Sequence, residues 1–139
     1  MILKNMFARV HVPLLKNALD AASLRQKVIA SNLANVETPN YVRKKVVFES
    51  ELQKVVGEKD MAIRTTNPRH ISTTGESPEK VQPRVVEDKS GGKASGVNNV
   101  DVDKEMAGLA KNQLYYAFTS KMMAWEFNQV KKAISERVR

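Results

Sequence analysis

The stretch ASNLANVETPNYVRKKVVFE, residues 30–49, changes character at its middle. As far as Val36 it has the spacing of an amphipathic helix, and from Thr38 it becomes a turn followed by a basic run rich in β-branched residues. The ring of Pro39 disfavours helical geometry at the residue before it. We therefore expect a long helix to end abruptly here, and its apolar face needs a partner.

The helix before this turn is predicted to run from about Pro13 to Val36. Proline suits the first turn of a helix, because its missing N–H would have no partner there. The apolar residues recur at separations of four and seven positions, which is typical of a narrow coiled-coil seam. The seam residues are Leu15, Ala18, Leu19, Ala22, Ile29, Leu33 and Val36.

A second, longer helix is predicted from about Asp101 to the C-terminus. Acidic residues at its start and basic residues at its end complement the helix dipole. At ~1.5 Å per residue this helix would extend on the order of 50 Å, which is too long for the rest of the chain to cover. Trp125 falls off the apolar stripe and suggests a second contact surface. The stripe itself comprises Met106, Leu109, Ala110, Tyr116, Ala117, Met123, Ala124, Phe127, Val130, Ile134 and Val138, with the polar Gln113 and Ser120 also at seam positions.

The segment between the helices has a different composition. VRKKVVFESELQKVV, residues 42–56, is consistent with a strand, a short helix, or one after the other. Prolines then punctuate a polar tract, and DKSGGKASGVNN, residues 88–99, has the composition of a flexible linker. We therefore divide the chain into an N-terminal helical part (1–39), a variable middle (40–100) and a C-terminal helical part (101–139).

The two helices are predicted to pair antiparallel. The expected fold is mainly α, a coiled-coil-like hairpin with a partly disordered or short-β middle. Set against the ordering entropy of about 1.5 kcal/mol per residue, the apolar surface buried by two helices leaves a net stability near zero. Such a chain is expected to be a subunit of a larger helical assembly.

The sequence offers little for catalysis. There is no cysteine, the two histidines are far apart in the sequence, and no glycine-rich phosphate loop is present. The run DVDKE, residues 101–105, fits a helix start better than a carboxylate metal site, because residues two apart on a helix point to nearly opposite sides. We predict that the chain is not an enzyme and needs no cofactor or metal.

Membrane and nucleic-acid functions are also disfavoured. No stretch approaches the roughly 18 apolar residues of a membrane span, and charges at Lys4 and Arg9 argue against an ordinary cleavable signal peptide. The net charge of +8 is spread along the chain, whereas nucleic-acid-binding proteins concentrate it where phosphates lie. The runs at 43–45 and 131–132 are interpreted as solvated surface. A basic helical nucleic-acid-binding protein remains the less favoured alternative.

Three stretches resemble one protein family. ASNLANVETPNY resembles the ANxxANxxTPGY signature of bacterial flagellar rod, hook and related axial proteins. The short length, IRTTNPRHI in the middle and NNVDVDKEMAGLAKNQLYYAF near the last helix narrow the resemblance to a short protein of the proximal rod. Asn40 occupies the place usually held by glycine, and asparagine is the least costly replacement if that position has a positive φ. We expect such a φ at Asn40.

The resemblance implies a structural subunit of the proximal rod, which passes motor torque to the hook. It implies export through the flagellar type III apparatus without a cleavable signal peptide, and assembly in the periplasm. The implied partners are other proximal rod subunits, the adaptor protein at the rod base and further copies of the chain; another short rod protein of the family is the nearest alternative. The implied motif turn comprises Asn32, Asn35, Thr38, Pro39, Asn40 and Tyr41. The implied packing surfaces are Leu15, Leu19, Ala22, Ile29, Leu33 and Val36 on the first helix, and Met106, Leu109, Tyr116, Met123, Phe127, Val130 and Ile134 on the last.

Overall fold

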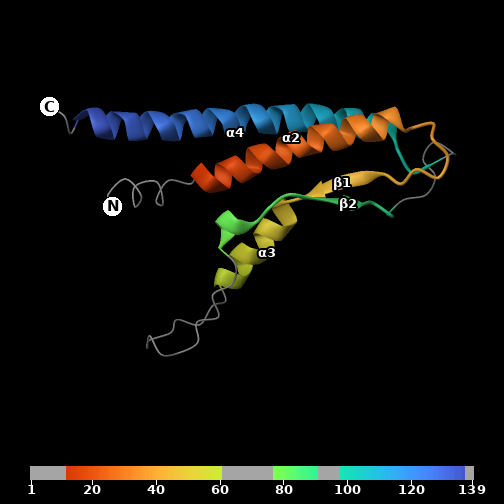
Figure 1. Ribbon diagram of the computed structural model, residues 1–139, viewed down its shortest axis with the longest axis horizontal. Helices are drawn as coiled ribbons and strands as arrows, with labels where there is room; N and C mark the ends of the chain where they lie inside the picture. Colours follow the sequence, from red (N-terminus) through yellow and green to blue (C-terminus); the bar gives the residue numbers. More distant parts are fainter. Residues whose placement is uncertain (1–11, 61–76, 91–97, 137–139) are drawn as a thin grey trace.

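The computed structural model describes residues 12–60, 77–90 and 98–136 and is mainly helical (Figure 1). The predicted fold class is confirmed, since the N- and C-terminal helices pack together and a short two-stranded sheet lies in the middle. The IRTTNPRHI stretch, most of the predicted linker and both chain ends lie outside the described residues. In chain order the elements are α2 (Val12–Ala34), β1 (Lys44–Val47), α3 (Glu49–Asp60), the 3-10 helix η1 (Pro78–Lys80), β2 (Arg84–Glu87) and α4 (Val102–Glu136).

Helix α2 ends two residues before the predicted boundary, and its hydrogen bonds change there to the tighter three-residue pattern. The N–H groups of Asn35 and Val36 bond to carbonyls three residues back, at 3.1 and 3.3 Å, as is common in a last helical turn. Two further turns follow, closed by bonds from Thr38 to Asn35 and from Tyr41 to Thr38. Asn40 has φ +59°, in the left-handed region. The predicted geometry at Asn40 is confirmed.

Helices α2 and α4 lie side by side and run in opposite directions (Figure 1). The amide of Asn112 donates to the carbonyl of Ala22 at 2.8 Å, and the amide of Asn32 donates to Glu105 at 3.2 Å. Contacts further along α2 are thus made earlier along α4, as an antiparallel hairpin requires. At ~1.5 Å per residue, α4 extends about 50 Å and α2 about 35 Å, so α4 is much the longer element.

Helix α4 begins as predicted, with Asp101 as its cap. The Asp101 carboxylate accepts the N–H of Lys104 at 3.1 Å, which satisfies one of the free donors of the first turn. The main-chain carbonyl of Asp101 accepts the N–H of Glu105 at 3.0 Å. These bonds fix where α4 starts and hence how it meets the turn after α2.

The described part of the middle segment lies along α2, from Asn32 near the end of the helix, which bonds Lys44, to Asn17 near its start, which bonds Glu79 and Val81. Residues 42–56 form a strand and then a helix, which settles the alternatives left open by their sequence. Strand β1 pairs antiparallel with β2, from Lys44 opposite Glu87 to Val47 opposite Arg84. The core beneath these elements is small and consists of Ala18, Ala21, Phe48, Val55 and Val81, with Leu14, Leu52 and Tyr115 packed at its edge.

Candidate functional site

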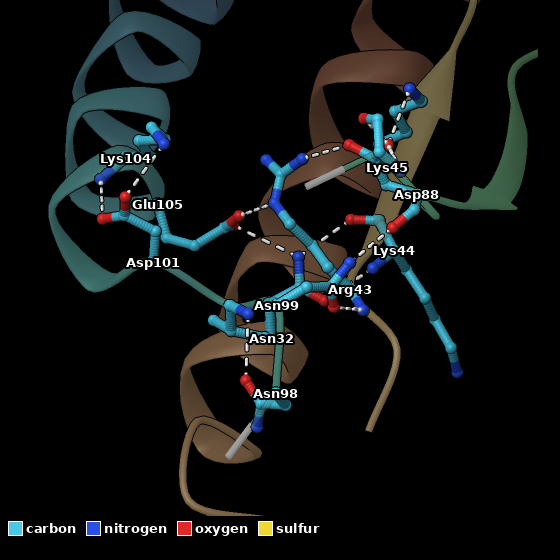
Figure 2. Close-up of polar contacts among 12 residues, drawn as sticks. Asn32, Arg43, Lys44, Lys45, Asp88, Asn98, Asn99, Asp101, Lys104 and Glu105 are labelled. Carbon is cyan, nitrogen blue, oxygen red and sulfur yellow. Dashed lines mark hydrogen bonds and ion pairs between the residues drawn. The ribbon is translucent and has the colours of Figure 1, made fainter. Parts of the chain in front are cut away.

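The side chain of Asn32 joins three parts of the chain (Figure 2). It is fully buried, and its amide forms both a donor and an acceptor bond with the backbone of Lys44, at 2.8 and 3.0 Å. The same amide donates to Glu105 at 3.2 Å and accepts the Tyr41 hydroxyl at 3.1 Å. All four hydrogen-bonding positions of the amide are therefore used, as burial of a polar group demands.

The side chain of Asn98 bonds the turn that follows α2. Its amide nitrogen lies 2.8 to 3.0 Å from the carbonyls of Asn35, Val36 and Thr38. Its carbonyl oxygen accepts the N–H of Val100 at 2.9 Å. These carbonyls lie at the end of α2, where backbone acceptors lack helical partners. The residues that lead into α4 thus cap the end of α2.

Arg43 lies between two carboxylates. Its Nε donates to Glu105 at 2.5 Å, and a terminal nitrogen donates to Asp88 at 2.6 Å. The backbone of Arg43 adds an N–H to the Asn99 side chain and a carbonyl for the N–H of Asp88, both at 2.7 Å. Glu105 is only 1% exposed. We call Asn32, Arg43, Asp88, Asn98, Asn99 and Glu105 the polar cluster.

Asp88 and Arg43 of the polar cluster both have shifted pKa values. A hydrogen bond from the Ser90 hydroxyl, opposed by burial and aided by Lys45, lowers the pKa of Asp88 from 3.8 to about 2. Burial acts to lower the pKa of Arg43, but its bonds to Glu105 and Asp88 prevail and raise it. Neither group titrates near neutral pH, so neither suits proton transfer there. The cluster is built for structure.

The cleft beside the polar cluster is small. The adjoining cleft holds about 200 Å³ and is bordered mainly by charged side chains, whereas small-molecule sites usually start near ~300 Å³ and are largely apolar. Within residues 12–60, 77–90 and 98–136, no three His, Asp or Glu side chains gather to hold a metal ion. None of the helices described is long and apolar enough to cross a membrane.

Comparison with known proteins places this sequence in a family. A family model for flagella basal body rod proteins matches residues 15–41, which span most of α2 and the motif turn. The FlgB basal body rod protein of Bacillus subtilis is 38% identical over 121 residues, 87% of this chain and 90% of the relative. That of Borreliella burgdorferi is 35% identical over 116 residues, 81% of this chain and 86% of the relative.

The chain belongs to the FlgB family of flagellar basal body rod proteins. The FlgB of Aquifex aeolicus is more distant, at 29% identity over 126 residues, yet the match covers 91% of this chain and 94% of the relative. The FlgB family is structural, so the chain is a structural protein and not an enzyme.

The structure gives physical roles to several residues of the FlgB-family motif. Asn35 donates to the carbonyl of Ser31 at 2.8 Å and accepts the Thr38 hydroxyl at 3.3 Å, which braces the turn. Tyr41 bonds Asn32, and the Lys44 ammonium lies 5.8 Å from its ring centre. Pro39 is exposed and lies five residues past the end of α2, where its ring keeps the chain from resuming a helix after the turns. The assignment of the motif turn as a functional site of the family stays a prediction.

The predicted seam residues are divided between the inside and the outside of the single FlgB-family chain. On α2, Ala22 and Ile29 are buried, and Leu15, Leu19 and Leu33 are half-buried, as is Val36 in the turn after the helix. On α4, Val130 is buried and Leu109 and Met123 are half-buried, but Met106, Tyr116, Phe127 and Ile134 are 46 to 51% exposed. Their packing against other subunits stays a prediction.

Polar residues occupy the centre of the face that α4 turns toward α2. Glu105, Asn112 and Thr119 follow one another at intervals of seven and are all buried. Gln113 was expected at this seam, but it is exposed and Asn112 takes the place. Arg25 of α2 reaches Asn112 at 3.3 Å, so the polar groups are paired across the helices. Helix α4 is thus rotated relative to the predicted seam, so that its buried polar side chains have hydrogen-bond partners.

Sequence reasoning missed several residues of the polar cluster. Arg43 was interpreted as solvated surface, which is wrong, because it is paired with two carboxylates. Glu105 was assigned to the helix start, yet it is buried and bonded to Arg43. One signal was available: the pair Asn98–Asn99, directly before a helix cap, is typical of side chains that bond local backbone.

Proposed function

We propose that this chain is a structural subunit of the proximal rod of the bacterial flagellar basal body. There it helps form the drive shaft that passes motor torque to the hook and so moves the cell. Membership in a family of basal body rod proteins supports this role. Torque transmission needs no catalytic group. It needs a subunit that resists internal slippage and offers contacts to its neighbours.

The observation that carries the proposal is the closure of the hairpin by the polar cluster. Asn32 and Arg43 both bond Glu105, which lies in the first turn of α4. Hydrogen bonds and ion pairs are directional, so a shift of α4 along α2 by one turn would break several of them at once, and each buried group left unpaired is costly. The register of the two helices is therefore fixed, as a load-carrying subunit requires.

The exposed surface of α4 supports a role in contacts to neighbours. In the described chain this helix packs mainly against α2, and much of its remaining surface is apolar. Large exposed apolar surfaces commonly mark protein–protein contacts. The exposed large apolar residues of α4 are Val102, Met106, Leu114, Tyr116, Phe118, Met122, Trp125, Phe127 and Ile134.

We infer the setting from the same role. The partners are other proximal rod subunits, the adaptor protein at the rod base and further copies of the chain. The chain reaches the periplasm through the flagellar type III export apparatus. Residues 1–39 and 101–139 form the core domain of the rod subunit, and residues 40–100 form its variable part. Nucleic acid has no part in this proposal.

Deletion of the gene tests the proposal. We expect non-motile cells whose isolated basal bodies lack rods and hooks in electron micrographs. A plasmid copy of the intact gene should restore both, which controls for effects on neighbouring genes. Motile cells with intact filaments after deletion would end the rod assignment.

A further inference from the structure

The outer side of α4 carries a narrow row of exposed apolar side chains. Leu114, Phe118, Met122 and Trp125 follow at spacings of four, four and three residues, so they share one face of the helix. They are 74, 64, 41 and 59% exposed. Within residues 12–60, 77–90 and 98–136, each of the four therefore keeps a large part of its surface open to solvent. Exposed apolar residues in series have a cost in water that a partner removes.

This row lies on the side of α4 that faces away from α2. Asn112 is turned toward α2, where it bonds the carbonyl of Ala22. Leu114 follows Asn112 by two residues, about 200° around the helix, and therefore points away from α2. In Figure 1, α4 runs along one edge of the molecule, with the other labelled elements on one side of it. A partner can reach the row without opening the hairpin.

Lysines border the row. Lys111 precedes Leu114 by three residues, Lys121 follows Phe118 by three, and Lys132 follows Trp125 by seven, so all three lie near the same face. All three are exposed, and none makes an ion pair within the described part of the chain. The one acid between Lys111 and Lys132 in the sequence is Glu126, which is half-buried.

We propose that this outer stripe, Leu114, Phe118, Met122 and Trp125 with its bordering lysines, docks an amphipathic helix of another protein whose apolar stripe is flanked by carboxylates. Its biological setting rests on the proposed rod function. Complementary charge steers encounter and fixes register at such contacts. A hollow of about 400 Å³ beside Trp125 and Lys132 can receive a side chain of that helix.

The charges disfavour a second copy of this chain as the occupant. Two outer stripes laid against each other would bring six lysines along one contact, with no exposed acid between Lys111 and Lys132 to offset them. Like charges across an interface are unfavourable and select against that pairing. The narrowness of the stripe also disfavours a lipid surface, because helices that lie in a membrane present a broad apolar face.

A binding experiment with designed peptides tests the inference. Trp125 is the only tryptophan of the chain, so its fluorescence reports on the outer stripe directly. The probe is a tryptophan-free, three-heptad amphipathic peptide with glutamates beside its apolar stripe; the control peptide has lysines there. We expect the glutamate peptide alone to shift the emission of the full chain to shorter wavelength, with binding that weakens as salt is raised.

Several outcomes would overturn the inference. Equal binding of both peptides, or no binding of either, would remove the charge argument. A dimer of the free chain that is lost in Phe118→Ser would assign the stripe to a second copy. Binding to phosphatidylglycerol vesicles in place of the peptide would assign it to lipid.

Two sets of variants sharpen the test. Phe118→Ser should abolish the fluorescence shift, whereas Phe127→Ser, the same change on another face of the same helix, should leave it intact. Reversal of Lys111, Lys121 and Lys132 to glutamate should weaken binding of the glutamate peptide about tenfold and should strengthen binding of the lysine peptide. Circular dichroism of each variant shows whether it remains folded. A charge reversal that leaves peptide preference unchanged would contradict the inference.

The same variants in cells separate this inference from the proposed function. In the deletion strain, the charge-reversal variant should fail to restore motility, and a Lys104→Glu variant outside the stripe should restore it. If the charge-reversal variant restores full motility while the deletion strain is non-motile, the outer stripe is not the docking site but the rod function stands. If the deletion strain itself is motile, the proposed function fails, whatever the peptides do.

Discussion

The polar cluster and the outer stripe are opposite arrangements in one small protein. In the polar cluster, charged and amide side chains are buried or half-buried and every one has partners, as Glu105 does with Arg43 and Asn32. In the outer stripe, Leu114 and Trp125 are apolar and mostly exposed. Directional polar bonds thus set the internal geometry of the subunit, while undirected apolar surface is left for other molecules. The chain specifies its own register before it meets a neighbour.

Removal of Arg43 should produce the largest loss of stability. Arg43→Ala leaves Glu105 buried without its cation. Loss of one partner of such a pair should lower the unfolding free energy by about 3 kcal/mol. This is the low end of the usual range, because Arg43 retains some exposure. Lys44→Ala is the matched control, since Lys44 is exposed and outside the ion pairs of the described chain. This variant should change the unfolding free energy by less than about 0.5 kcal/mol.

Urea unfolding followed by circular dichroism gives both values. A stabilising osmolyte such as trimethylamine N-oxide keeps a weakly stable variant measurable. Similar values for Arg43→Ala and Lys44→Ala would show that the polar cluster does not hold the hairpin.

Acid should loosen the polar cluster through Asp88. The pKa of Asp88 is depressed from 3.8 to about 2 in the folded chain, so the folded state favours the ionised form. Its contribution to stability is complete above the unfolded pKa, near pH 4, and is lost as the pH falls toward 2. After allowance for solvent screening we expect about 1 kcal/mol.

The pH dependence is measured against Asp88→Asn. The difference in unfolding free energy between the two proteins should be constant from pH 7 to 5 and shrink below pH 4. Glu87→Gln, an exposed neighbour, should run parallel to the unaltered chain over the whole range. A difference that does not change with pH would mean that Asp88 acts by shape and not by charge.

The outer stripe should tolerate polar substitution within the free subunit. Leu114→Gln keeps helix propensity nearly unchanged and alters a mostly exposed side chain. We therefore expect the unfolding free energy to change by less than about 0.5 kcal/mol. Ile29→Val, which deletes one methyl group from the buried helix interface, should cost more, about 1 kcal/mol. Thermal unfolding of both variants makes the comparison. A larger loss from Leu114→Gln would show that the stripe packs inside the chain.

Local features of the fold were predictable because they arise within a few residues. Pro39 prevents a helix from continuing past the turns after α2 through backbone sterics, and Asp101 caps α4 through bonds to its own first turn. The positive φ of Asn40 followed from the family glycine at that place. The rotation of α4 was not predictable, since its sequence contains apolar residues on more than one face and periodicity alone does not say which face meets α2.

The amino-acid sequence by itself determined two long helices, an abrupt turn between the first helix and a mixed middle segment, and the absence of cysteine chemistry. Only the tertiary structure decided which charges are buried. Arg43 and Glu105 are 62 positions apart, and Asn32 and Glu105 are 73 apart. Whether such groups are solvated or paired depends on where the folded chain brings them, because burial removes the water that would otherwise stabilise each charge alone.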